Sequence, residues 1–332
     1  MSEEITATVQ AVRLSYDIAK DIVKALKAIL EKKGSDLEVE AKTVTKNGVE
    51  KEAALVGAED SNVKATVYLD DSIEKIQNGE STVEEEAEAA AKCIEFQVNE
   101  KGMNSARGYA KELDNPDKSK IKLQVVNSDL NREMLEHTPH RDVAGDLSLI
   151  GRYYFDGEAS TVITDDLATH MGLTGTEVLE IGQSNIKHEE YSVKHMGEMI
   201  ADMMGMPMDE AQEMFPQEQK MLVVTNESKI HGATGLFANP ELREQVAEKL
   251  GGDFLILPSS LHEVICIPKD SLSVDEAKDM ISSVNQTELR PEDILSDHPY
   301  ACNASTLKVS NPCQAEEIKE VAGAVRHASA GR

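Results

Sequence analysis

Aromatic residues are scarce in this sequence, which has no tryptophan, seven tyrosines and five phenylalanines. It therefore offers little for the stacking platforms that hold single-stranded nucleic acid. Cysteine is equally scarce, and the four cysteines (Cys93, Cys266, Cys302 and Cys313) form no C-x-x-C pair. This spacing indicates reduced thiols and argues against a disulfide framework or a zinc site.

Basic residues are outnumbered, with 34 lysines and arginines against 61 acidic residues and a formal net charge of −27. Nucleic acid and anionic membrane surfaces repel such a polyanion, so we expect neither as a direct partner. Two interpretations of the acidity stay open. The charge keeps the protein soluble, or it forms a surface aimed at a basic partner, as in an acidic regulator or an anti-defence protein.

Long apolar runs are also missing, and none approaches the ~20 residues of a membrane helix. The start of the chain, Met1-Ser2-Glu3-Glu4, is acidic and lacks the apolar stretch of a signal peptide. We therefore expect a cytoplasmic protein, and we predict no membrane association and no cofactor.

Apolar periodicity predicts an α+β fold, with mostly antiparallel sheet and flanking helices. A first unit is expected over residues 1–115, with a helix over 4–33, a small antiparallel sheet and a second helix over 84–98. Asn47-Gly48 predicts a two-residue hairpin turn in this sheet, because both residues adopt positive φ readily.

A larger α+β unit is expected over residues 119–310, followed by a polar tail over 311–332. Within it, residues 121–190 and 220–290 both read as strand, helix, strand, strand, helix. These segments are either copies of an internal duplication that share a sheet, or a chance similarity. Residues 192–215 are expected to be helical.

A short turn between two apolar runs carries several reactive side chains. Residues 254–257 and 264–267 predict the strands of a hairpin, with Ser260, His262 and Glu263 between them. In an extended chain Ser260 and His262 share a face, which is the minimum for an activated nucleophile. No G-x-S-x-G elbow is present, and serines after a proline are ordinary turn residues. Structural capping is favoured, with a binding site or a nucleophilic site as alternatives.

His140 and Asp142 form a second candidate site, in the string Thr138-Pro139-His140-Arg141-Asp142. A His and an Asp two residues apart orient one another or bind a metal, whereas a loop after a terminating proline is the plainer interpretation. This loop and the turn at His262 occupy similar positions in the two segments, so we hypothesise that they meet. His140 and His262, with Asp142 and Glu263, then become candidate metal ligands, although their spacing matches no zinc motif.

Methionine is strongly clustered, and seven of the 13 methionines lie between residues 196 and 214. Met196, Met199 and Met203 recur at i, i+3 and i+7, which places them on one helical face. Thioether side chains are flexible and polarisable, and they suit an adaptable binding surface. Core packing is the plainer interpretation and a groove for a partner protein is the alternative. Cu(I) ligation has little support.

Four strings of the chain resemble a domain-of-unknown-function family found in gut Firmicutes. They are Glu133-Met134-Leu135 with Pro139-His140, Val223-Val224-Thr225-Asn226, Leu257-Pro258-Ser259-Ser260-Leu261-His262-Glu263-Val264, and Glu292-Asp293-Ile294-Leu295-Ser296-Asp297. The resemblance runs from the first helix to about Tyr300. From residue 120 onward the layout is more distantly similar to the uncharacterised YtpP-like family. The resemblance implies a cytoplasmic bacterial protein and carries over no catalytic residues.

These features favour a cytoplasmic protein that works by binding another protein with a basic or apolar surface. Met196, Met199 and Met203 are the candidate contact residues. The alternative is a hydrolase or a metal-dependent enzyme that uses His262 with Ser260 or Glu263, and with His140. An enzyme needs those groups close together in a pocket, whereas an interaction protein needs the methionines exposed.

Overall fold

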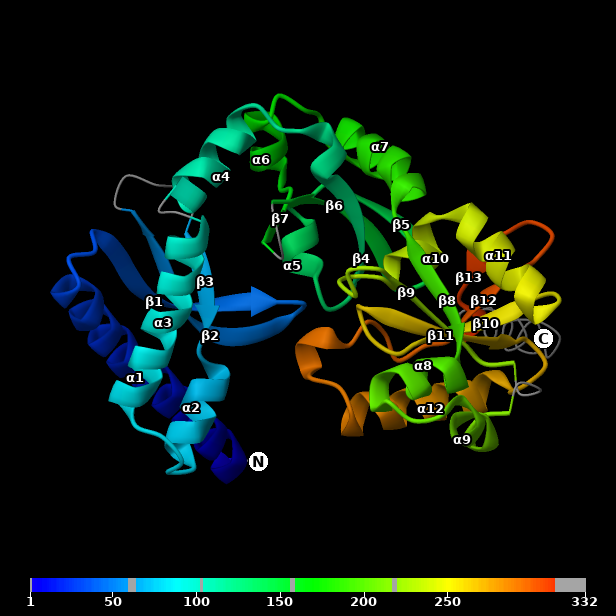
Figure 1. The fold of residues 1–332 in the computed structure, drawn as a ribbon, viewed down its shortest axis with the longest axis horizontal. Coiled ribbons are helices and arrows are strands. Elements are labelled where there is room, and N and C mark those ends of the chain that lie inside the picture. Colours follow the sequence, from blue (N-terminus) through cyan, green and yellow to red (C-terminus); the bar gives the residue numbers. More distant parts are fainter. Residues whose placement is uncertain (1, 59–63, 102–103, 156–158, 217–219, 314–332) are drawn as a thin grey trace, which may run out of the picture. The chain divides into compact units, whose positions relative to one another are not determined.

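A computed structural model of the chain describes residues 2–58, 64–101, 104–155, 159–216 and 220–313 (Figure 1). The chain divides into two compact units, Met1–Pro116 and Asp117–Arg332. Both units combine helices with antiparallel sheets, which confirms the predicted α+β class. Most of the expected tail lies outside the described residues. Within the described ranges, no helix is long and apolar enough to cross a membrane.

The first unit packs helices on a three-stranded sheet of order β1-β2-β3. Its elements are α1 (Ser2–Lys32), β1 (Leu37–Lys46), β2 (Val49–Ala58), β3 (Ala65–Tyr68), α2 (Asp70–Gln77), α3 (Val83–Lys101) and α4 (Asn104–Asp114). Asn47 (φ +49°) and Gly48 (φ +75°) join β1 to β2, whose register pairs Lys46 with Val49. The predicted two-residue turn is thus confirmed.

The second unit contains two sheets (Figure 1). In the smaller sheet the order is β4-β6-β5, and β7 pairs with β6. Its strands and helices are β4 (Ile121–Asn127), α5 (Arg132–Leu135), β5 (His140–Ala144), β6 (Leu147–Tyr154), β7 (Ser160–Val162), α6 (Asp165–His170) and α7 (Gly175–Asn185).

The larger sheet has six strands in the order β13-β12-β10-β11-β9-β8. Its strands are β8 (Tyr191–His195), β9 (Leu222–Asn226), β10 (Phe254–Pro258), β11 (Glu263–Pro268), β12 (Tyr300–Cys302) and β13 (Val309–Ser310). The helices are α8 (Met196–Met204), α9 (Met208–Met214), α10 (Thr234–Ala238), α11 (Pro240–Leu250) and α12 (Val274–Thr287). The predicted hairpin around residues 258–263 is present as β10 and β11, with Leu257 paired to Ile265.

Both faces of the larger sheet are covered. Val224 and Val264 face a core that includes Leu236 of α10 and Val246 of α11. The opposite face packs against Ala277 and Ile281 of α12, among other residues. Because side chains alternate along a strand, Ser192, Thr225 and Glu263, which lie side by side in the register, belong to the α12 face.

The structure corrects the helix predicted over residues 192–215. Residues 191–195 form strand β8, and two separate helices follow. Tyr191, Ser192 and Val193 pair with β9, and strand pairing satisfies their backbone groups in place of a helix. Gly205 ends α8 at a left-handed φ of +62°, where glycine carries no steric penalty.

The two segments that suggested a duplication pair their strands differently. In the first segment β4 pairs with β6, the strand that follows Asp146. In the second segment β9 pairs with β11, whereas β10, the strand that follows Asp253, pairs with β11 and β12. An internal duplication stays a prediction.

A polar cluster joins the two sheets of the second unit. The carboxylate of Asp146 accepts hydrogen bonds from Tyr300 (2.5 Å), Ser296 (2.8 Å) and Asn127 (2.7 Å). Asn127 ends β4, and Tyr300 begins β12. Burial, together with the Asp146 carboxylate, raises the pKa of Tyr300 far above its usual range, so the phenol stays a donor. Ser296, which belongs to the string Glu292-Asp293-Ile294-Leu295-Ser296-Asp297, therefore has a structural role.

Candidate functional site

The hydroxyl of Ser260 closes the turn between β10 and β11. It accepts hydrogen bonds from the backbone N–H groups of His262 (3.0 Å) and Glu263 (3.3 Å). The Ser260 N–H donates to the Glu263 carbonyl at 3.1 Å. Ser260 is buried, whereas His262 and Glu263 are half-buried, so these bonds satisfy backbone groups at the boundary between core and solvent. This geometry favours the capping interpretation of Ser260.

His262 projects from this turn and meets three groups from other parts of the chain. Its Nδ1 accepts a hydrogen bond from the backbone N–H of His231 at 3.2 Å. The two imidazole rings are stacked, with centroids 5.8 Å apart and 20° between their planes. Nε2 of His262 lies 3.6 Å from Oδ1 of Asp293, at the end of a short 3-10 turn (Pro291–Asp293). Both side chains remain partly exposed.

His231 is a site residue that was not among the candidate catalytic or metal-binding residues predicted from the sequence. It lies in the loop after β9, where its φ is +54°, and its Nδ1 is 2.7 Å from the hydroxyl of Tyr154. The next residue, Gly232, packs so closely that a Cβ there would lie 2.5 Å from both Asn226 N and the His262 carbonyl oxygen. The His231-Gly232 dipeptide was the available signal, because such an approach requires glycine.

Tyr154, which contacts His231, lies beside a network of polar side chains that connects the smaller sheet to the larger one. The Glu189 carboxylate accepts hydrogen bonds from Tyr191 (2.7 Å), Asn226 (3.0 Å) and Lys122 (3.2 Å). The Lys122 ammonium also lies 5.4 Å from the ring centroid of Tyr154. Burial raises the pKa of Tyr154 and of Tyr191 well above the usual range, and the Glu189 charge adds to the effect. Both phenols are therefore neutral.

His140 and Asp142 make contacts within their own part of the chain. His140 lies in β5, and its Nδ1 is 2.9 Å from the Thr138 carbonyl oxygen. Asp142 accepts a hydrogen bond from Ser148 at 2.7 Å. The described residues include no group of three or more His, Cys, Asp or Glu side chains that could hold a metal ion. The predicted meeting of this loop with the turn at His262 stays a prediction.

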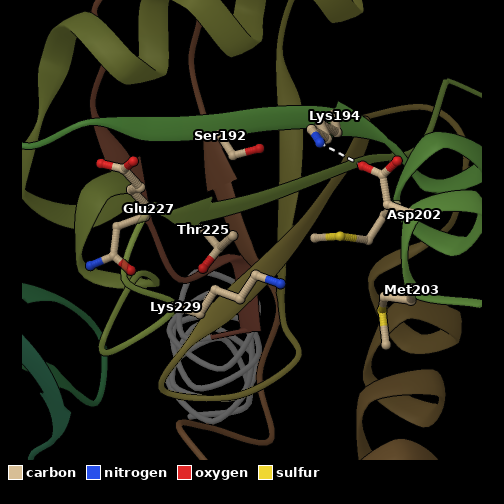
Figure 2. A pocket seen from close by; sticks show the side chains of 9 residues that line it. Ser192, Lys194, Asp202, Met203, Thr225, Glu227 and Lys229 are labelled. Carbon is tan, nitrogen blue, oxygen red and sulfur yellow. Dashed lines mark hydrogen bonds and ion pairs between the residues drawn. The ribbon is translucent and has the colours of Figure 1, made fainter. Parts of the chain in front are cut away.

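A cavity of about 260 Å³ lies where α8, β8 and the end of β9 come together (Figure 2). Its lining includes two of the three predicted methionines, Met199 and Met203. Met196 begins α8, is half-buried and does not line the cavity. The other lining residues are Ser192, Lys194, Asp202, Thr225, Asn226, Glu227 and Lys229. We call this cavity the methionine pocket.

Strand pairing brings the polar wall of the methionine pocket together. Ser192 of β8 lies directly opposite Thr225 of β9, and Thr225 lies opposite Glu263 of β11. The Thr225 hydroxyl donates a hydrogen bond to the His262 carbonyl at 2.8 Å. The pocket and the turn that carries Ser260, His262 and Glu263 thus share Thr225. Residues far apart in sequence supply this wall, so spacing alone gave no signal for it.

The charged residues of the pocket differ in whether they form ion pairs. Lys194 forms an ion pair with Asp202 at 2.6 Å. The exposed Lys229 extends into the pocket (Figure 2), and it makes no ion pair with any described residue. The pocket therefore offers two thioethers, two hydroxyls and charges of both signs. Such a lining suits an apolar side chain carried on a polar backbone.

Comparison with curated proteins and with solved structures finds no match for the chain. A family model described as "Family of unknown function (DUF5688)" matches residues 17–303. The matched residues include the methionine pocket and the His231–His262 pair. Because the match spans most of the 332 residues, the chain belongs to the DUF5688 family.

Proposed function

We propose that this protein binds a segment of another protein at the methionine pocket, and that binding rather than catalysis is its activity. The observation that carries the proposal is the position of Met203, which lines the pocket while its side chain is 74% exposed. A large apolar side chain so exposed beside a cavity is typical of a contact surface.

Further exposed methionines lie on α8 and on α9, the helix that packs against it. Met204, Met208 and Met214 of α8 and α9 are also exposed. Methionine adapts its shape to a partner because it has an unbranched, polarisable side chain. Together with Met199 and Met203, these residues form what we call the methionine surface. It is suited to partners whose apolar side chains differ in shape.

Charge indicates which partner fits. Exposed acidic residues lie on the same helices as the methionines: Asp202, Asp209, Glu210 and Glu213. The whole chain carries a formal charge of −27. A partner segment that alternates or mixes basic with apolar residues is therefore attracted, whereas an acidic segment is repelled.

Two short synthetic peptides of equal length test this proposal with the full chain. One consists of lysine and leucine, and in the other glutamate replaces every lysine. We expect measurable binding of the lysine peptide, by fluorescence anisotropy, and a loss of roughly tenfold or more with Met203→Ser. Met280→Ser is the matched control, because Met280 of α12 is 41% exposed and does not line the pocket.

The proposal is overturned if the glutamate peptide binds as tightly as the lysine peptide. It is also overturned if Met203→Ser and Met280→Ser weaken binding equally. Moderate ionic strength is needed in all measurements, because a purely electrostatic attraction of lysine to an acidic protein is screened by salt.

A further inference from the structure

Strand β8 forms one end of the larger sheet. The sheet order places β9 on one side of β8, and no described strand pairs with its other side. β8 is five residues long and contains no proline. Ser192 and Lys194, which line the methionine pocket, both belong to β8. The edge of the sheet and the pocket are therefore parts of one surface.

The hydrogen bonds at both ends of β8 fix which backbone groups face away from β9. Glu227 N donates to Glu190 O at 3.1 Å, and Met196 N donates to Met221 O at 2.9 Å. In an antiparallel ladder, hydrogen-bonded pairs alternate with non-hydrogen-bonded pairs. With this register, Ser192 and Lys194 direct their backbone groups toward β9, and Tyr191, Val193 and His195 direct theirs outward.

Features that commonly protect a sheet edge are weak here. Natural edges carry prolines, bulges or lysines that block a further strand. The register between β8 and β9 runs without a bulge. The single lysine of β8, Lys194, has its ammonium 2.6 Å from the Asp202 carboxylate, on the pocket face. The outward N–H and C=O groups of Val193, at the centre of the strand, form no hydrogen bond with a described residue.

We propose that an extended segment of the partner protein pairs with the free edge of β8 as a seventh strand of the larger sheet. The inference rests on the proposed function and adds its binding mode. Backbone hydrogen bonds to Tyr191, Val193 and His195 hold the segment. Its alternate side chains lie on the face that carries Ser192 and Lys194, and one of them enters the methionine pocket.

The occupant of this edge is a basic segment of another protein rather than a second copy of this chain. Pairing two β8 edges would bring together two molecules that each carry a formal charge of −27. It would also bring two sets of acidic helix residues, such as Asp202 and Asp209, toward one another. Like charges across an interface cost free energy, whereas a lysine-bearing strand gains it.

Two lysine-leucine peptides of identical composition distinguish the binding modes. In one, leucines alternate with lysines, as a strand requires. In the other, leucines recur at the spacing of a helical face. We expect the alternating peptide to bind the full chain at least roughly tenfold more tightly, because only it presents its leucines to one face of the added strand. Tighter binding of the helical peptide overturns the inference.

Val193→Pro tests the edge directly. Proline removes the outward N–H of residue 193 and leaves the ladder to β9 intact, and edge strands tolerate it. We expect the alternating peptide to lose roughly tenfold or more in affinity. Val193→Thr keeps the N–H but changes the side chain, so the difference in affinity between the proline and threonine variants measures the loss of the backbone hydrogen bond. Unchanged binding to a folded Val193→Pro variant overturns the inference.

Peptide N-methylation gives the same test without altering the protein. Methylating every second amide in one register blocks the bonds to β8, and methylating the other set leaves them intact. Loss in one register alone supports strand addition, and no loss in either register overturns it. If binding depends on Met203 but not on Val193 or on N-methylation, strand addition fails while the proposed function stands. If no lysine peptide binds, the proposed function itself fails.

Discussion

The Nδ1 atom of His262 accepts a hydrogen bond from the backbone N–H of His231, 3.2 Å away. A backbone N–H can only donate, so Nδ1 carries a lone pair and the proton of the neutral ring is on Nε2. That nitrogen lies 3.6 Å from the Asp293 carboxylate. Two groups from different parts of the chain therefore orient the imidazole at the edge of the turn.

We expect the neutral His262 ring to be the Nε2–H tautomer. The ring nitrogen shifts in a long-range proton–nitrogen correlation spectrum, recorded at alkaline pH, report the tautomer. His140 is the internal comparison, because its Nδ1 lies 2.9 Å from the Thr138 carbonyl oxygen, which can only accept. His140 should therefore carry its proton on Nδ1. Identical tautomers for the two rings would contradict the geometry.

Ser260→Ala should lower the free energy of unfolding by about 1 kcal/mol, because the backbone N–H groups of His262 and Glu263 lose their acceptor in a partly buried turn. Denaturant unfolding measures the change. Ser259→Ala is the control, since the Ser259 hydroxyl makes no hydrogen bond with a described residue. Its cost should stay within about 0.5 kcal/mol. If the two substitutions lower the free energy of unfolding equally, the Ser260 hydroxyl does not cap the turn.

Local sequence patterns were sufficient to predict several elements of the fold. The first helix, the Asn47-Gly48 turn and the hairpin from β10 to β11 were all predicted from periodicity and turn residues. The error at β8 shows the limit. Methionine spacing correctly predicted a helix from residue 196. The residues before it form a strand because Ser192 pairs with Thr225, and this contact joins residues that are far apart in sequence.

The candidate site was predictable only in its separate parts. Met199, Met203 and His262 stood out from their neighbours in sequence. Lys229 did not, and no sequence pattern placed His231 beside His262, because both depend on a loop that β9 and the turn at residue 260 position together. Asn226 organises this loop by accepting from Ile230 N (3.1 Å) and donating to Ile230 O (2.8 Å). A loop that is closed by the hydrogen bonds of one side chain produces no periodic pattern in the sequence.

Glu52→Gln should stabilise the protein at neutral pH. Burial raises the pKa of Glu52, and the charges of Asp70 and Glu50 raise it further, against the lowering effect of the Thr43 hydrogen bond. The folded state thus disfavours the Glu52 carboxylate. The folded state is stabilised by holding the Glu52 proton more tightly than the unfolded chain does. This stabilisation is fully present below the pKa of Glu52 in the unfolded chain, and it is lost as pH rises through the pKa of Glu52 in the folded protein.

Glutamine keeps an acceptor for Thr43 and never ionises, so the gain should be present at neutral pH and disappear in acid. Thermal unfolding across pH measures this dependence. Glu38→Gln, at an exposed position of β1, is the control and should leave the difference near zero at every pH. A stabilisation by Glu52→Gln that persists in acid would show that charge is not its cause.

Mild peroxide should oxidise Met203 and Met204 before Met171, because their side chains are 74% and 69% exposed whereas that of Met171 is 6% exposed. Peptide mapping by mass spectrometry measures the order.

A sulfoxide is polar, so binding of the alternating lysine-leucine peptide should fall in step with oxidation of Met203. A variant with leucine at positions 199, 203, 204, 208 and 214 keeps the apolar surface but cannot be oxidised there, and should retain binding after peroxide. Loss of binding in this variant would place the sensitive group elsewhere. Binding that survives complete oxidation of Met203 would separate the methionine surface from the partner contact.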